Sequence, residues 1–377
     1  MKIIGIIAEY NPFHLGHLYQ INKIKELYPD SLIIVIVSSI FTQRGDISLI
    51  NKWDKTKIIL DNNVDMVIEL PFVYATQSSD IFAKGALEIL NYLKIDTLVF
   101  GSESNDINKL TNLANIQLND KNYDNLVKKY LDKGINYPTA LSKALKDITN
   151  IDITSPNDLL GLSYVKEIIK NNYNIKPISI KRTNNYHSKE INSNIINATL
   201  IRNLIKENKD ISNFIPKYNK KIIYKNNIND FYNLFKYNVT INKNNLKNIV
   251  SVDEGIENRL LKYINIAKNF DELTNYLKTK RYTYNKLNRM YVHILTNFYK
   301  EDNNNIKINY IRLLGFNSKG KDYLNKIKKD INIPIITNYK KNISKLLDIE
   351  LRATSIYSMI IDNELLDKEY KNKPIIK

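Results

Sequence analysis

Two histidines in one short turn, His14 and His17, are the residues of this chain best suited to chemistry. They flank Gly16 and follow an apolar run at residues 3–8 that predicts a buried strand. The residues after His17 predict a helix. A helix N-terminus presents free N–H groups and a partial positive charge, and imidazoles donate hydrogen bonds to phosphoryl oxygens. The turn therefore predicts a phosphate site, with a capped helix start or half of a metal site as the alternatives.

A second polar group, Asn197, Thr199 and Arg202, lies at the start of another predicted helix. Arg202 follows Thr199 by one helical turn, so both side chains are expected on the same side. A hydroxyl, free backbone N–H groups and a guanidinium together suit a clamp for the β- and γ-phosphates of a nucleotide. The alternative is a capped helix whose arginine points to solvent.

The elements that must position these residues alternate between strand and helix across the front half. Strands are expected at residues 2–8, 32–38, 66–70, 97–100 and 175–180, and helices at 16–27, 52–62, 78–93 and 159–170. Continuous Ile, Val and Leu runs fit parallel strands that are covered on both faces. This order predicts a doubly wound parallel sheet, whose ligands bind beyond the carboxyl ends of the strands. His14 and His17 lie at such an end.

The positive charge of the chain is concentrated in its back half. The net charge is +17 overall, but residues 1–200 carry 22 Lys and Arg against 21 Asp and Glu, whereas residues 201–377 carry 34 against 18. A neutral front half and a basic back half predict that the second half meets a nucleic acid. Compositional drift from AT-rich coding is the alternative, although drift would act on both halves alike.

Cations and aromatic residues are interleaved in the back half. Lys278, Lys280 and Arg281 adjoin Tyr282, which predicts contacts with RNA through charge and base stacking. The residues that follow, 285–300, predict an amphipathic helix. His293 lies off its apolar stripe, and we predict a solvated or interfacial side chain rather than a ligand.

Composition excludes several classes of site. The 377 residues include no cysteine, which rules out disulfides, thiolate metal sites and a thiol nucleophile. No apolar run approaches the roughly 20 residues that span a bilayer, and the N-terminus lacks the layout of a signal peptide. We therefore expect a cytoplasmic protein without membrane contact, and we predict no metal site built by the chain itself. Nothing in the sequence indicates the oligomeric state.

The His-x-Gly-His pattern after a first strand resembles the nucleotidyltransferase superfamily, which attacks the α-phosphate of ATP and releases pyrophosphate. Longer strings resemble one family within it, the bacterial tRNA(Met) cytidine acetate ligases. The most specific string is EYNPFHLGH at residues 9–17. The others are TQRG (42–45), KW (52–53), ELP (69–71), YATQS (74–78), FGSE (100–103), PND (156–158), LG (160–161), RLLGFN (312–317) and RATSIY (352–357). The resemblance covers nearly the whole chain, with a departure at Asn197, where the family more often has serine.

The length of 377 residues predicts two domains, and their boundary is expected near residues 205–215, where polarity rises and Pro216 interrupts. By the resemblance, residues 1–207 would form an α/β domain with a doubly wound, parallel, Rossmann-like nucleotidyltransferase sheet that binds ATP. Residues 208–377 would form a basic, largely α-helical domain that binds tRNA.

The resemblance also implies a two-step reaction. Acetate attacks the α-phosphate of ATP, which gives acetyl-adenylate and pyrophosphate. The N4 amine of the wobble cytidine in elongator tRNA(Met) then attacks the acetyl carbonyl, which gives N4-acetylcytidine and AMP. Mg2+ is expected at the site and is held mainly by phosphates.

In this reaction His14 and His17 would be catalytic, and Thr199 and Arg202 would join the ATP site. The other ATP-binding residues that the resemblance implies are Ile7, Ala8, Glu9, Tyr10, Asn11, Pro12, Phe13, His14, Leu15, Gly16, His17, Leu18, Tyr19, Gln20, Gly101, Asn157 and Arg182.

Two other classes of function share parts of this pattern. A small-molecule adenylyltransferase would share the first domain, but it would not need a strongly basic second domain. A non-catalytic RNA-binding protein with a vestigial nucleotide fold would share the second domain. It would have no reason to keep His14, His17, Thr199 and Arg202 together.

Overall fold

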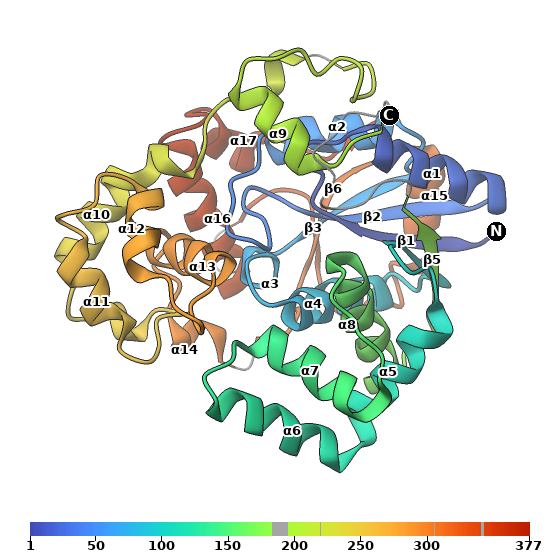
Figure 1. Cartoon of the computed structure of the whole chain (residues 1–377). Coiled ribbons are helices and arrows are strands. Elements are labelled where there is room, and N and C mark those ends of the chain that lie inside the picture. Colours follow the sequence, from blue (N-terminus) through green and yellow to red (C-terminus); the bar gives the residue numbers. More distant parts are fainter. Residues whose placement is uncertain (183–194, 219, 305, 341–342) are drawn as a thin grey trace.

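The structure, a computed structural model, describes residues 1–182, 195–218, 220–304, 306–340 and 343–377. Its centre is an eight-stranded sheet in the order β5-β4-β1-β2-β3-β6-β7, with β8 beside β6 (Figure 1). The strands are β1 (Ile3–Ala8), β2 (Leu32–Ser38), β3 (Met66–Leu70), β4 (Thr97–Ser102), β5 (Lys176–Lys181), β6 (Ile311–Phe316), β7 (Ile335–Ile336) and β8 (Ile375–Ile376). The five strands predicted from the front half are present, with small differences at their ends.

The front of the sheet is doubly wound, as its sequence predicts. Strands β1 to β5 pair in parallel, and the apolar side chains of β2 are fully buried because helices cover both faces. Helices α1 (Leu15–Leu27) and α2 (Lys52–Asp61) lie on one side, and α4 (Ser79–Tyr92) and α8 (Pro156–Lys170) lie on the other (Figure 1). The strand order reverses at β1, so a crevice forms beyond the carboxyl ends of β1 and β4.

Three helices between β4 and α8 were not predicted. Helix α5 (Ile107–Asn119) packs against α8, while α6 (Lys121–Asp132) and α7 (Tyr137–Thr149) form an antiparallel pair beside it (Figure 1). Their start residues cap them: Asp106, Asp120 and Asn136 each accept a hydrogen bond from a backbone N–H of the first turn. This insertion lies at the same side of the molecule as α8.

The back half is mostly helical, as predicted. The remaining helices are α3 (Phe72–Ala75), α9 (Ala198–Lys206), α10 (Tyr232–Ile241), α11 (Ile256–Tyr263), α12 (Phe270–Leu277), α13 (Tyr284–Leu295), α14 (Lys300–Asn303), α15 (Ser318–Ile327), α16 (Lys345–Ser358) and α17 (Leu365–Lys371), with short 3-10 turns at Lys220–Ile222, Ile228–Phe231 and Leu246–Asn248. Helices α10 to α14 and α16 lie together at one end of the sheet, whereas α15 lies near α1 at the other end (Figure 1).

No local pattern predicts that the back half extends the front sheet. Strand β6 pairs antiparallel with β3, and β7 and β8 pair with β6. Apart from Arg312, the short string at β6 is apolar, and all but its last residue are buried, but nothing local distinguishes it from a buried helical segment. The last part of the chain therefore shares one sheet with the first. The division at residue 207 stays a prediction.

A cluster of buried charges lies where the end of the chain meets this sheet. The Lys52 Nζ atom lies 2.6 Å from Glu69 Oε1, 3.0 Å from Glu369 Oε1 and 3.7 Å from Glu350 Oε1. Arg312 on β6 lies 3.5 Å from Glu369 Oε2. Removing one partner of such a buried pair costs about 3–5 kcal/mol, because a charge is then left unpaired. The cluster therefore holds α16 and α17 against β3 and β6.

The apolar stripe predicted on α13 is buried, and of the two placements predicted for His293, solvated or interfacial, the solvated one is wrong. Its side chain is fully buried, and Nε2 lies 3.0 Å from the Thr76 carbonyl oxygen while Nδ1 lies 3.2 Å from that of Val250. Helix α13 is covered on two sides, by the end of α3 and by the segment around Val250. Helical periodicity identifies one buried face, so it misses a helix that is enclosed more fully. Within the described ranges, no helix is long and apolar enough to cross a membrane.

Candidate active site

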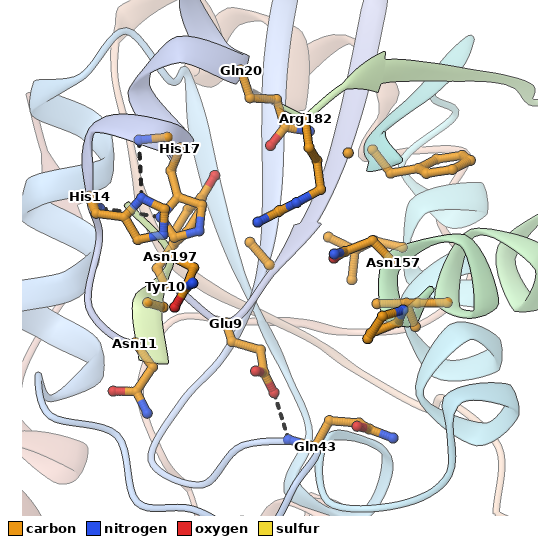
Figure 2. A pocket seen from close by; sticks show the side chains of 18 of the residues that line it. Glu9, Tyr10, Asn11, His14, His17, Gln20, Gln43, Asn157, Arg182 and Asn197 are labelled. Carbon is orange, nitrogen blue, oxygen red and sulfur yellow. Dashed lines mark hydrogen bonds between the residues drawn. The ribbon is translucent and has the colours of Figure 1, made fainter. Parts of the chain in front are cut away.

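A pocket opens at the carboxyl ends of β1 and β4, at the point where the strand order reverses. Figure 2 shows His14 and His17 on one wall and Asn157 on the opposite wall, with Arg182 reaching between them and Glu9 below. Loops after β1, β2, β4 and β5 and the starts of α1, α8 and α9 supply these walls. Ligands of doubly wound sheets bind at this position.

The two histidines form the start of α1. His14 is its N-cap: the Gly16 N–H donates to His14 Nδ1 at 3.0 Å, and the His14 N–H donates to His17 Nδ1 at 3.2 Å. The rings stack with their centroids 3.7 Å apart. Because both Nδ1 atoms accept hydrogen bonds, each neutral ring carries its proton on Nε2. The turn thus presents two Nε2–H donors that are held in place by backbone contacts.

Both imidazoles are neutral at physiological pH. Burial, with smaller contributions from Arg182 and Arg202, lowers the pKa of His14 to about 3. Burial and the neighbouring His14 and Arg182 lower the pKa of His17 well below its ordinary value. Each neutral ring can therefore donate a hydrogen bond through Nε2, but it contributes no positive charge. The positive charge of the pocket comes from Arg44, Lys181, Arg182 and Arg202.

The opposite wall is built from the ends of β4 and β5 and the start of α8. Arg182 follows β5 directly, and its Nε lies 4.0 Å from Glu103 Oε1. The same Glu103 oxygen accepts a hydrogen bond from Asn157 Nδ2 at 2.6 Å. Glu103 thus orients both pocket residues, a role that the sequence did not reveal. Gly101 lies beside the Arg182 side chain, and an added Cβ there would meet Arg182 Cγ at 3.4 Å.

Thr199 and Arg202 face each other across the first turn of α9, on the same side as predicted. Arg202 Nη2 donates to Thr199 Oγ1 at 3.0 Å, and Nη1 donates to the Asn11 carbonyl oxygen at 2.9 Å. Asn197 caps the helix, because its Oδ1 accepts from the Leu200 N–H at 2.9 Å. Both Thr199 and Arg202 line the pocket, so the arginine does not point to solvent.

The sequence did not reveal that Lys55 holds the base of the pocket together. Lys55 is fully buried, and its Nζ donates to the carbonyl oxygens of Glu9 at 2.9 Å, Ser38 at 2.9 Å and Ser39 at 3.2 Å. It thereby ties the ends of β1 and β2 together. Burial lowers the pKa of Lys55 to about 7. A lysine on an amphipathic helix ordinarily lies at the surface, which is why sequence alone does not single it out.

The predicted site residues fall into three groups: members of the ATP set that do not line the pocket, the predicted RNA-binding residues, and members of the ATP set that line it. Four members of the predicted ATP set do not line the pocket: Pro12, Phe13, Leu15 and Leu18. Phe13, for example, is fully buried against Tyr10, on the side of the turn away from the hollow. Lys278, Lys280 and Arg281 lie outside it as well, on the surface, where Arg281 is 3.2 Å from Glu254. The pocket is lined by the rest of the set: Ile7, Ala8, Glu9, Tyr10, Asn11, His14, Gly16, His17, Tyr19, Gln20, Gly101, Asn157, Arg182, Thr199 and Arg202.

Comparison with known proteins places this geometry in a family. A model of the family described as HIGH Nucleotidyl Transferase matches residues 1–373. The chain is 38% identical to the tRNA(Met) cytidine acetate ligase of Fusobacterium nucleatum, across 100% of this chain and 99% of that protein. It is 37% identical to the protein of the same name from Caldicellulosiruptor saccharolyticus, across 100% and 98%.

Solved structures show the same likeness in three dimensions. The apo crystal structure of Thermotoga maritima TmcAL superposes with a TM-score of 0.91 at 28% identity, covering 100% of this chain and 99% of that one. The crystal structure of Thermotoga maritima TmcAL bound with alpha-thio ATP superposes with a TM-score of 0.90 at 29% identity, with the same coverage.

Proposed function

This chain belongs to the tRNA(Met) cytidine acetate ligase family of HIGH nucleotidyl transferases, and we propose that it acetylates the wobble cytidine of elongator tRNA(Met) at N4, with acetate and ATP as co-substrates. The observation that supports this most directly is the paired Nε2–H donors of His14 and His17, which face Arg182 and Arg202 within one pocket. Such a site suits the α-phosphate of ATP.

In the first step, a carboxylate oxygen of acetate attacks the α-phosphorus and pyrophosphate leaves. Negative charge builds on the equatorial oxygens, where neutral imidazole N–H groups are strong and already oriented donors. Thr199 and Arg202 would hold the departing β- and γ-phosphates, since a guanidinium binds phosphate through parallel N–H groups. Asn157, Gly101 and Arg182 would contact the rest of the nucleotide.

Mg2+ would reach the site with the triphosphate. Within the described part of the chain, no three His, Asp or Glu side chains are grouped to hold a metal ion. This fits a cation whose ligands are mainly phosphate oxygens and water. The metal would neutralise charge on the leaving pyrophosphate.

In the second step, the tRNA approaches from the basic back half. Residues 208–377 are proposed to bind it, with Lys278, Lys280 and Arg281 among the contacts, because all three side chains are exposed. Exposed cations bind the phosphate backbone without reading sequence. A tRNA substrate also supports the predicted cytoplasmic location.

The function is tested by incubating the protein with ATP, labelled acetate and bulk tRNA, followed by nucleoside analysis. We expect label in N4-acetylcytidine, with AMP and pyrophosphate formed in equal amounts. Consumption of ATP with a small-molecule acceptor and no label in tRNA would instead indicate a small-molecule adenylyltransferase.

A further inference from the structure

A carboxylate lies inside this anion-binding pocket, and phosphate binding does not explain it. Glu9, at the end of β1, lines the same hollow as Arg44, Arg182 and Arg202. A fixed negative charge opposes the binding of triphosphate and of acetate. Its position beside the imidazoles therefore suits a ligand that donates hydrogen bonds (Figure 2).

The Glu9 side chain is anchored through one oxygen. Oε1 accepts a hydrogen bond from the Gln43 N–H at 2.6 Å, while Lys55 holds the Glu9 carbonyl at 2.9 Å. Gln43 is itself fixed, because its Nε2 donates to the Gln77 carbonyl at 2.8 Å and its carbonyl accepts from Arg289 of α13 at 3.3 Å. Among the described residues, none donates a hydrogen bond to Glu9 Oε2. Within that part of the chain, this oxygen is a positioned acceptor without a donor.

The reaction supplies such donors in the adenine N6 amine and the ribose hydroxyls of ATP and in the N4 amine of the target cytosine, and of these only the N4 amine must lose a proton. The N4 amine of cytosine carries two N–H groups, and carboxylates are the side chains that accept from it. Its lone pair is delocalised into the ring, so it attacks a carbonyl effectively only when a base removes a proton. Resting on the function proposed above, we propose that Glu9 accepts a hydrogen bond from N4 of the target cytidine and takes up its proton during acetyl transfer.

The N4 lone pair attacks the carbonyl carbon of acetyl-adenylate, and the N4–C bond forms. The bond from that carbon to the AMP phosphate oxygen breaks, and its electron pair leaves with AMP. One N4 proton passes to Glu9 Oε2 and then to solvent. Burial raises the pKa of Glu9, although the Gln43 N–H, Arg44, Arg202 and Lys55 oppose this shift, and a carboxylate with a raised pKa is a stronger base.

The test compares the two half-reactions in Glu9→Gln. Glutamine keeps an oxygen for the Gln43 N–H but cannot take up a proton. The rate of adenylation is measured as the acetate-dependent exchange of pyrophosphate into ATP. Transfer is followed in a single turnover, from enzyme loaded with labelled acetyl-adenylate to bulk tRNA. We expect transfer to slow by about 100-fold or more, the usual range for losing a general base, and exchange to fall far less.

Asp46→Asn is the matched control, because Asp46 also lines the pocket and its replacement removes the same charge. Equal slowing of exchange and transfer in Glu9→Gln would overturn the proposal and indicate a role in binding nucleotide or metal. Unchanged transfer would also overturn it, as would an equal loss of transfer in Asp46→Asn. Failure of the wild-type protein to label tRNA would refute the proposed function itself, whatever the variant does.

Discussion

At the scale of single residues, the tautomers of His14 and His17 decide what the site can do. Both Nδ1 atoms accept hydrogen bonds from backbone N–H groups, so the catalytic role that we propose for the pair depends on two Nε2–H donors. Replacing either histidine with alanine should slow acetate-dependent pyrophosphate exchange by about 100-fold or more, as the loss of an oxyanion donor does. The loss of the Nδ1 caps should cost only about 1 kcal/mol of folding stability. Near-normal exchange in the double variant would contradict this role.

Arg202 is the residue for which the triphosphate clamp can be tested. Its guanidinium reaches the Asn11 carbonyl and Thr199 at once, and lysine cannot reproduce that fork. Arg202→Lys should therefore raise the KM for ATP and slow the release of pyrophosphate, measured by steady-state kinetics. Asn197→Ser is the companion variant, which should be tolerated because serine also caps helices. Unchanged ATP kinetics in both Arg202→Lys and Arg202→Ala would exclude the clamp.

At the scale of elements, α13 is coupled to the front half through His293, whose burial has a consequence for pH. Burial, with a smaller contribution from Arg289, lowers the pKa of His293 to about 3. The unfolded chain therefore binds the proton first, near pH 6.5, so the neutral side chain favours the folded state fully above that pH and less as pH falls from 6.5 towards 3.

His293→Gln should accordingly show a shallower loss of stability on acidification than the wild type. Between pH 6.5 and 5.5 the difference should reach about 1 kcal/mol, the linkage expected for one histidine. Chemical denaturation at a series of pH values measures it. Because His14, His17 and the buried carboxylates are common to both proteins, the comparison isolates this one side chain. Parallel curves would mean that folding does not lower the pKa of His293.

At the scale of the whole molecule, the two halves differ in charge and share one sheet. The excess of Lys and Arg after residue 200 predicts that tRNA affinity depends on this half. Neutralising Lys278, Lys280 and Arg281 together should weaken tRNA binding and make its logarithmic dependence on salt shallower, because fewer counterions are released. Binding titrations at several salt concentrations give that slope. The rate of acetate-dependent pyrophosphate exchange should stay the same. An equal loss of exchange and of tRNA binding would mean that these residues support the fold.

The local sequence determines the strands and helices of the front half and the turn that contains His14 and His17. Runs of Ile, Val and Leu place β1 to β5, and the residues around Gly16 place the histidines at a helix start, because both patterns depend on neighbours along the chain. Whether a side chain lines the pocket was less predictable. Pro12, Phe13, Leu15 and Leu18 belong to the same turn and helix start as the histidines but do not line it.

The tertiary structure alone decided the long-range features. Strand β6 pairs with β3 although more than two hundred residues separate them, and no local periodicity encodes that pairing. Local periodicity also does not encode the burial of Lys55, His293 and the Lys52 cluster. Lysine and glutamate ordinarily lie at the surface, and histidine is intermediate. Their burial becomes possible only when distant segments supply the hydrogen bonds and counter-charges, because a buried polar group without such partners would destabilise the fold.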